Sequence, residues 1–225
     1  AALMTAGLAL REGVMADLRA GGSDPKHFYI SFDKTDDPSS GFVDSVAPPR
    51  YSTGYFPLRN RFAMLVETHS WKDYPTRVRI THNTIVSLLS QVAQHGQEWH
   101  KLTRDADARA VAMGGGEFPL SYRTTFNTKT IQFAGYEYTR EHSVVSGGLW
   151  TRYDESKPQM WTVPLRDEVV PDLWIKAPQG GYIVPLAHAA WVGAKLKQHG
   201  IEFKVIKDDQ MAAEVETFRA TKTTF

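Results

Sequence analysis

The chain has 225 residues, 42% of them hydrophobic and 12% aromatic, which is enough apolar material for one large domain or two ordinary ones. Its 26 basic and 25 acidic residues leave a net charge of +1, so no overall field favours nucleic acid or an anionic membrane surface. No stretch reaches the roughly 18 uninterrupted apolar residues of a membrane span, and the absence of cysteine excludes disulfides, thiolate zinc sites and cysteine nucleophiles. We therefore expect neither nucleic acid nor membrane as a partner.

The N-terminal region has the spacing of a helix. Apolar residues recur at helical intervals over residues 3–20, and Gly21-Gly22 follow as a natural stop. Arg11 and Glu12 lie in the middle of this stretch, which is unlike the apolar core of a signal peptide. The sequence opens with Ala inside the expected helix, so we expect it to be part of a longer product.

The next hundred residues predict a strand, a loop, a second strand and a helix. Residues 27–33 are aromatic and β-branched, as in a strand, and residues 33–55 collect the Pro, Gly, Ser and Asp of a long ordered loop. Residues 62–66 form a continuous apolar run, which is typical of a strand buried on both faces of a largely parallel sheet. Apolar residues at helical intervals over 85–100 then predict an amphipathic helix.

The second half of the chain differs in pattern. Gly114 to Gly116 mark a boundary, after which apolar and polar residues alternate as in half-buried antiparallel strands, with a turn at 127–128. Four later prolines are expected to keep the strands short. We also expect a helix over residues 186–198 and a short strand over residues 201–206. The fold class predicted is α/β, with a mixed sheet flanked by helices over residues 1–113 and a smaller β-rich domain over residues 117–225.

No phosphate-binding glycine loop or serine nucleophile motif occurs in the sequence. His95-x-x-Glu98, with His100 close behind, could place two zinc ligands on one helical face. The stretch lies at the polar end of the expected helix, where solvated His and Glu are ordinary, so a solvated face is the simpler interpretation.

Glu67 follows directly after the apolar run of residues 62–66. In open α/β sheets, ligands bind outside the carboxyl ends of the strands, and a partly desolvated carboxylate there suits proton transfer near neutral pH. The structural alternative is an ion pair with Arg59, Arg61 or Arg77. Residue chemistry alone leaves both interpretations open.

One segment adds a resemblance to a known family. "RYSTGYFPLRNRFAMLVETHSWKDYPTRV" (50–78) combines Tyr-x-x-Leu-Arg-Asn-Arg, an apolar run, Glu-Thr-His and Tyr-x-x-Arg-Val. This combination resembles the C-terminal part of the catalytic domain of carboxypeptidase A-type zinc carboxypeptidases, in a bacterial branch. Residues 180–203 are similar to a C-terminal element attached to such domains, so the resemblance covers most of the chain in two parts.

The resemblance implies a zinc-dependent peptidase acting on peptide substrates. Glu67 matches the general base, which takes a proton from a zinc-bound water whose pKa the metal lowers to about 7. Tyr51 and Tyr55 are the candidates for a loop tyrosine that closes over the substrate, although both lie nearer Glu67 in sequence than in the classical enzymes, and a packed loop residue is the alternative for each. Residues that bind substrate or orient Glu67 are expected among Arg59, Arg61, His69, Lys72 and Arg77.

The zinc ligands that the family uses do not occur where they are expected. The family's His-x-x-Glu and a later histidine precede the glutamate, whereas His27 is the only histidine before Glu67. The resemblance therefore implies a longer parent protein whose missing N-terminal part carries Zn²⁺, with no metal bound by this chain alone. By family analogy the parent is periplasmic or secreted.

Two other functions fit the sequence. The first is a non-catalytic module in which Trp150, Tyr153 and Trp161 hold a carbohydrate or peptide, although such aromatics also serve as core or strand-pairing residues. The second is a pseudoenzyme that keeps the scaffold and has lost its metal site.

Overall fold

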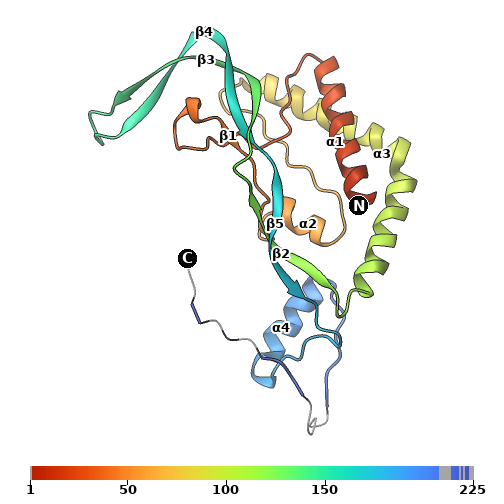
Figure 1. The fold of residues 1–225 in the computed structure, drawn as a ribbon. Coiled ribbons are helices and arrows are strands. Elements are labelled where there is room, and N and C mark those ends of the chain that lie inside the picture. The colour runs from red at the N-terminus through yellow and green to blue at the C-terminus, as the bar shows by residue number, and fades with distance from the viewer. Residues whose placement is uncertain (1, 208–213, 218, 220, 223–225) are drawn as a thin grey trace. The chain divides into compact units, whose positions relative to one another are not determined.

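A computed structural model describes residues 2–207, 214–217, 219 and 221–222 (Figure 1). Contacts divide the chain into two units, residues 1–180 and 181–225. The helices and the mixed and antiparallel sheets of the first unit confirm the α/β class. No helix in the described part of the chain has the length and apolar character needed to cross a membrane.

The first unit opens with helix α1 (Ala2–Ala20), a single-turn 3-10 helix η1 (Pro38–Ser40) and helix α2 (Ser52–Leu58). The expected N-terminal helix is confirmed, and Gly22 adopts a φ of +79° where the helix stops. Helix α3 (Tyr74–Val111) is 38 residues long and extends the predicted helix at both ends. It starts early because the Asp73 side chain accepts a hydrogen bond from the Thr76 amide and a proline occupies the first turn.

Two sheets follow, and their pairing is not sequential. Strand β4 (Leu149–Arg166) lies between β3 (Lys129–His142), antiparallel to it, and the short β1 (Phe42–Val43), parallel to it. Strands β2 (Glu117–Thr124) and β5 (Val169–Lys176) form a separate antiparallel pair. Antiparallel strands in this half were predicted, but residues 127–128 form no turn and connect β2 to β3, which belong to different sheets.

Three predictions about strands outside residues 62–66 were wrong. Residues 27–33 contain only an isolated bridge from Phe32 to Phe42, and residues 201–206 form no strand. Strand β4 has 18 residues although it contains Pro158 and Pro164. Proline is tolerated there because the first lies next to a register shift opposite Tyr136, and because β4 has β3 as its only neighbour along most of its length.

The core of the sheet region joins residues that lie far apart in the sequence of the first unit. Phe28 and Phe42 pack with Trp161, Val163 and Leu165 of β4, and Phe42 and Leu165 are the most deeply buried, at 1% and 0% exposure. This cluster and the β1–β4 pairing explain why contacts divide the chain after residue 180 and not at 114–116.

Two glycines allow this core to close. A Cβ at Gly135 would lie 2.3 Å from the Trp161 ring, and one at Gly41 would lie 2.0 Å from the carbonyl oxygen of Pro164. Gly41 also has a φ of +73°, which disfavours other residues. Both positions therefore let the chain approach β4 more closely than a side chain would permit.

A second cluster joins the helices. Leu10, Val14 and Leu18 of α1 pack against Trp99 of α3, and Phe62 and Met64 add to this cluster from the segment between α2 and α3. Figure 1 shows α1 and α3 lying side by side. The same segment carries Glu67.

The second unit contains helix α4 (Leu186–Gln198), in the range where the sequence predicts a helix. His199 is its C-terminal cap, and Gly200 follows with a φ of +61°. Phe203 lies against this helix, with its ring 3.4 Å from the position that a Cβ of Gly193 would occupy.

Candidate functional site

Glu67 lies on a segment that is neither helix nor strand, so the prediction of a buried strand over residues 62–66 was wrong. Phe62 and Met64 are half-buried, whereas Leu65 and Val66 are exposed at 53% and 40%. An apolar run indicates that a segment is suited to burial, but it does not indicate whether this chain supplies a strand to pair with it. Within the described residues, no strand pairs with this run.

The Glu67 side chain is exposed. Among the described residues, it makes no hydrogen bond or ion pair with Arg59, Arg61, Lys72 or Arg77. The ion-pair alternative for this carboxylate is therefore not realised in the part of the chain that the structure describes.

One end of the segment is anchored by a paired arginine. The guanidinium of Arg61 donates two hydrogen bonds to the carboxylate of Asp107 on α3, at 3.0 and 2.9 Å, and the Asn60 amide donates a third at 3.1 Å. These bonds, first from Arg61 and then from Asn60, lower the pKa of Asp107 below the usual range of an aspartate. Arg61 therefore attaches this segment to α3. Its partner Asp107 lies 46 residues away in sequence, so the sequence did not predict the pair.

The other end of the segment is anchored by ring contacts. The Trp71 amide donates to Nδ1 of His69 at 3.1 Å, and the two rings meet edge to face. Trp71 in turn lies 6.0 Å from the ring of Tyr153 on β4. Burial, followed by the charge of Asp36, raises the pKa of Tyr153. His69 therefore contributes to holding the segment, while the Lys72 side chain is exposed.

Arg77 lies on the first turns of α3. Its guanidinium is 5.9 Å from the ring of Tyr74, and its Nε is buried without a hydrogen-bond partner among the described residues. A buried donor without a partner costs stability unless water or a ligand completes it. Of the predicted orienting residues, Arg77 is the one with an unused buried donor.

The two candidate tyrosines flank the start of α2. Tyr51 is its N-cap residue, and its hydroxyl accepts a hydrogen bond from Arg50, whose guanidinium also lies 4.9 Å from the ring. Tyr55 is half-buried and meets Phe56 edge to face. Tyr51 is the more accessible of the two, at 51% exposure.

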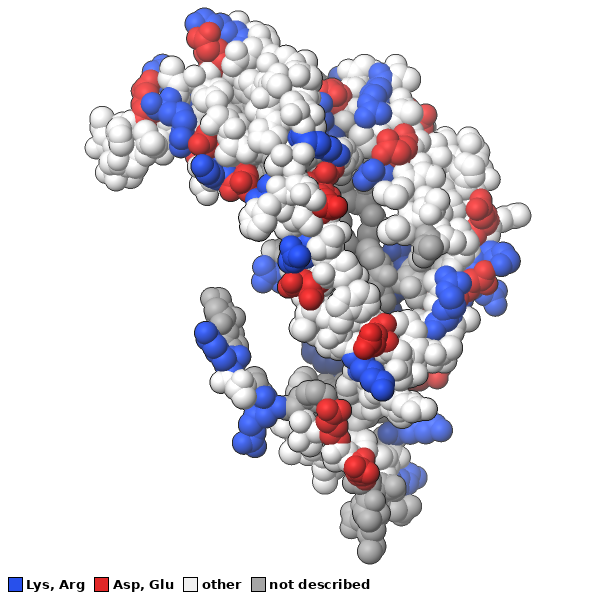
Figure 2. All heavy atoms as spheres, in the orientation of Figure 1, with Lys and Arg blue, Asp and Glu red and all other residues white. Residues whose placement is uncertain are grey.

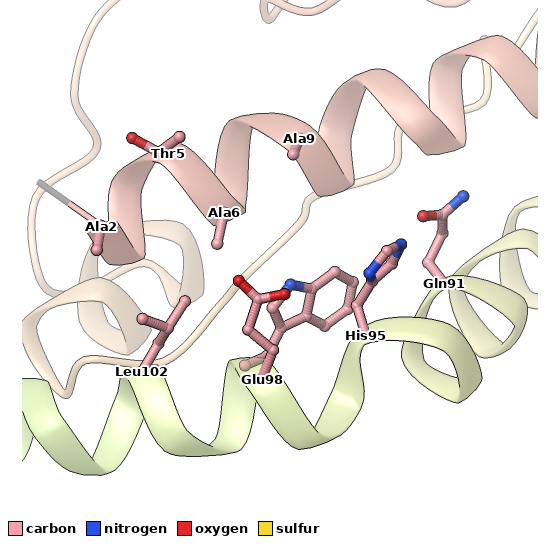
Figure 3. Close-up of a pocket in the computed structure, with 9 residues that line it drawn as sticks. Ala2, Thr5, Ala6, Ala9, Gln91, His95, Glu98 and Leu102 are labelled. Carbon is pink, nitrogen blue, oxygen red and sulfur yellow. The ribbon is translucent and has the colours of Figure 1, made fainter.

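A groove of about 420 Å³ lies between α1 and α3. In Figure 3, Gln91, His95 and Glu98 of α3 point toward α1, which lines the groove with the small side chains of Ala2, Ala6 and Ala9. The His95 ring stacks on Trp99, with the ring centroids 5.5 Å apart. His95 and Glu98 thus share a face, as their spacing predicts, but His100 does not line this groove.

The residue types needed for a closed metal site do not gather in the described part of the chain. No group of three or more His, Asp or Glu side chains is arranged there to hold a metal ion. The residues present therefore do not fit a catalytic zinc, and His95 with Glu98 provides at most two ligands.

The aromatic platform considered for a binding module is not formed. Trp161 is buried at 9% exposure, and Tyr153 is half-buried and packs against the same core cluster. Trp150 is exposed, at the base of the β3–β4 turn. Figure 2 shows blue and red side chains interspersed along this hairpin and an uncharged tip.

Comparison of the chain with protein-family models, with curated proteins and with solved structures finds no match. The functional assignment therefore depends on the resemblance of residues 50–78 and on the geometry described above.

Proposed function

We propose that this chain is part of a zinc-dependent metallocarboxypeptidase that hydrolyses peptide bonds, with Glu67 as its general base. The observation that supports this role best is that the Glu67 carboxylate is exposed and unpaired among the described residues, while one candidate partner, Arg61, is bonded to Asp107. A general base must be reachable by the water it activates and must not be committed to an ion pair.

The anchoring of the Glu67 segment also favours this role. Arg61 is bonded to α3 on one side of Glu67, and the Trp71 ring lies 6.0 Å from that of Tyr153 on β4 on the other side, so contacts on both sides restrain the segment. Fixed positions reduce the motion that a catalytic group must lose before reaction. In the proposed reaction, Glu67 takes a proton from the attacking water and returns it to the leaving amine.

The described residues do not fit a zinc site, so the proposal assigns the metal ligands to another part of the parent protein. It places them in the N-terminal part of the catalytic domain, which would be this chain's functional partner. Reading the coding sequence that precedes Ala1 tests this assignment: a His-x-x-Glu followed by a later histidine supports it, and their absence supports a pseudoenzyme.

The test of the role of Glu67 uses the parent protein. Glu67→Gln keeps the size and hydrogen-bonding capacity of the side chain but removes the base. We expect hydrolysis of an N-blocked dipeptide with a free C-terminal carboxylate to fall by at least about 100-fold, with the zinc content unchanged.

Glu155→Gln is the matched control, because Glu155 is also an exposed glutamate and lies on β4, outside the segment that carries Glu67. It should leave turnover unchanged. Turnover retained by Glu67→Gln would contradict the assignment of the base. A zinc-loaded parent that hydrolyses no peptide would contradict the assignment as an enzyme.

A further inference from the structure

Helix α3 has one face that is covered at its C-terminal end and bare at its N-terminal end. Residues at steps of three or four share a helical face, and such steps define here an α3 seam. It consists of Ile85, Leu89, Val92, Gly96, Trp99, Thr103 and Asp107. The two halves of this seam are buried to very different extents.

The C-terminal half is covered by the chain itself. Asn60 and Arg61 bond to Asp107, and the ring of Phe62 meets Trp99 edge to face at 5.4 Å. Trp99, which also packs against α1, and Thr103 are buried, at 8% and 9% exposure. The segment that carries Glu67 thus runs along the seam toward the N-terminal end of α3 as its own numbering increases.

The N-terminal half of the seam is apolar and uncovered. Ile85, Leu89 and Val92 are exposed at 51%, 64% and 51%. The same turns of α3 bury small polar residues instead: Thr84 and Ser87 are 2% and 5% exposed, and the Ser87 hydroxyl donates to Asp17 of α1. These turns of α3 therefore bury Thr84 and Ser87 together with part of Leu88, and leave a second, apolar side bare.

These turns of α3 carry no charged side chain of their own. Residues 80–97 form eighteen consecutive positions without Asp, Glu, Lys or Arg. Residues 62–66, which approach the same seam, are also uncharged. Solvated helix faces normally carry charged residues, and exposed apolar clusters mark interaction sites, so this surface is suited to an uncharged partner.

The backbone of the approaching segment indicates the form of the partner. The alternating burial of Phe62 to Leu65 is typical of an extended chain. Residues 62–68 make no backbone hydrogen bond to another described residue. Unpaired backbone groups of an extended chain are satisfied best by another strand.

We propose that the N-terminal half of the α3 seam, together with residues 62–68, binds an extended apolar β-strand of a partner polypeptide. The covered half supports this choice, because residues 60–64 already occupy it and, after the turn at Asn60, this segment has the alternating burial of an extended chain. Helix pairing with a second copy is disfavoured: the bare seam from Ile85 to Val92 spans about 12 Å, and a stable interface buries about 800 Å² on each partner. The proposal goes beyond the peptidase assignment and does not depend on zinc or on hydrolysis.

The test uses the whole chain with a single label. Because the sequence contains no cysteine, Leu89→Cys provides a unique site for an environment-sensitive fluorophore. The probe is a synthetic peptide with the sequence of residues 60–68, since this segment covers the other half of the seam. We expect a saturable blue shift of the fluorophore emission on titration with the peptide.

Three controls make the test decisive. A label at Val111→Cys, 90% exposed at the end of α3 and outside the seam, should show no shift. Ile85→Asp in the Leu89→Cys background should abolish the shift, with the helical circular dichroism unchanged. A peptide with serine at each apolar position should not bind.

Two outcomes would overturn the proposal. One is the absence of any peptide-dependent shift at Leu89→Cys. The other is a blue shift that depends on the chain's own concentration without peptide and coincides with a dimer in sedimentation, which would identify a second copy as the occupant. Neither outcome bears on the role of Glu67, because no hydrolysis is measured.

Discussion

The sheet region and the helix pair of the first unit bury their apolar residues to different extents. In the sheet region, Phe42 and Leu165 are buried almost completely, and an aromatic cluster closes around them. In the helix pair, Val14 and Trp99 are buried, but Ile85 and Leu89 of the same α3 helix face solvent. The first core is complete within the chain, and the second continues past its edge.

The difference lies in which neighbouring elements the chain supplies to each region. Strand β4 finds its neighbours β1 and β3 in the same chain. The apolar run before Glu67 finds helices on one side and no strand beside it among the described residues. One core of this chain is thus closed by its own elements, and the other adjoins an apolar side of α3 that is exposed in the described part of the chain.

The largest effect is expected from Phe42→Ala in the complete core. Removing a buried aromatic side chain costs about 3–5 kcal/mol, because the surrounding residues cannot fill the cavity. Urea denaturation followed by tryptophan fluorescence measures this loss in the chain. The fully exposed Val144→Ala is the control and should change stability by less than about 0.5 kcal/mol. Equal stability of the two variants would show that the sheet core is not closed as described.

Gly135→Ala tests the same core by overpacking it. The added Cβ would lie 2.3 Å from the ring of Trp161, so either the ring or β3 must move. We expect a loss of about 1–3 kcal/mol in the same urea measurement. Gly180→Ala, which meets no atom within 4 Å, should be close to neutral.

Two adjacent leucines on α3 compare the covered and bare sides of one helix. Leu88 packs against the helix cluster and Leu89 is 64% exposed. We expect Leu88→Ala to cost about 1–2 kcal/mol and Leu89→Ala less than about 0.5 kcal/mol in the chain alone. Thermal unfolding monitored by circular dichroism measures both. The reverse order would mean that the bare seam is already covered.

The smallest effect is expected from Asp107→Asn, and it should depend on pH. The pKa of Asp107 is lowered by the hydrogen bonds from Arg61 and Asn60, so the folded chain prefers the ionised carboxylate. Its contribution to stability is therefore present above the ordinary pKa of an aspartate and is lost as the pH falls through the lowered value. The urea midpoints of wild type and variant should differ at neutral pH and converge in acid. A difference that persists in strong acid would contradict the ion pair.

Local patterns predicted much of this fold. Helical spacing placed α1 and the centre of α3, and alternation placed the antiparallel strands, because these signals depend on neighbours along the chain. They did not give the contact between Arg61 and Asp107 or the pairing of β1 with β4, since both join residues far apart in sequence. The apolar run before Glu67 predicts a buried strand, and this prediction was wrong. Composition indicates that a segment is suited to burial, but it does not indicate whether a pairing strand is present.

For the candidate site, the sequence singled out Glu67 by its position after an apolar run, and its chemical role stays a prediction. The anchors Asp107 and Trp71 were not predicted, because a lone Asp on a helix and an exposed Trp carry no signal of their partners. The burial of Trp161, in contrast, could have been suspected from its place in an alternating strand.

The most direct measurement compares alkylation rates at the two ends of the α3 seam in the chain alone. Leu89→Cys and Thr103→Cys lie on the same helical face, one on the bare half and one on the half covered by residues 60–64. We expect iodoacetamide to modify Leu89→Cys at least about tenfold faster, because the thiol at position 103 reacts only when the segment opens. Equal rates at the two positions would contradict a seam that the chain closes at one end and leaves open at the other.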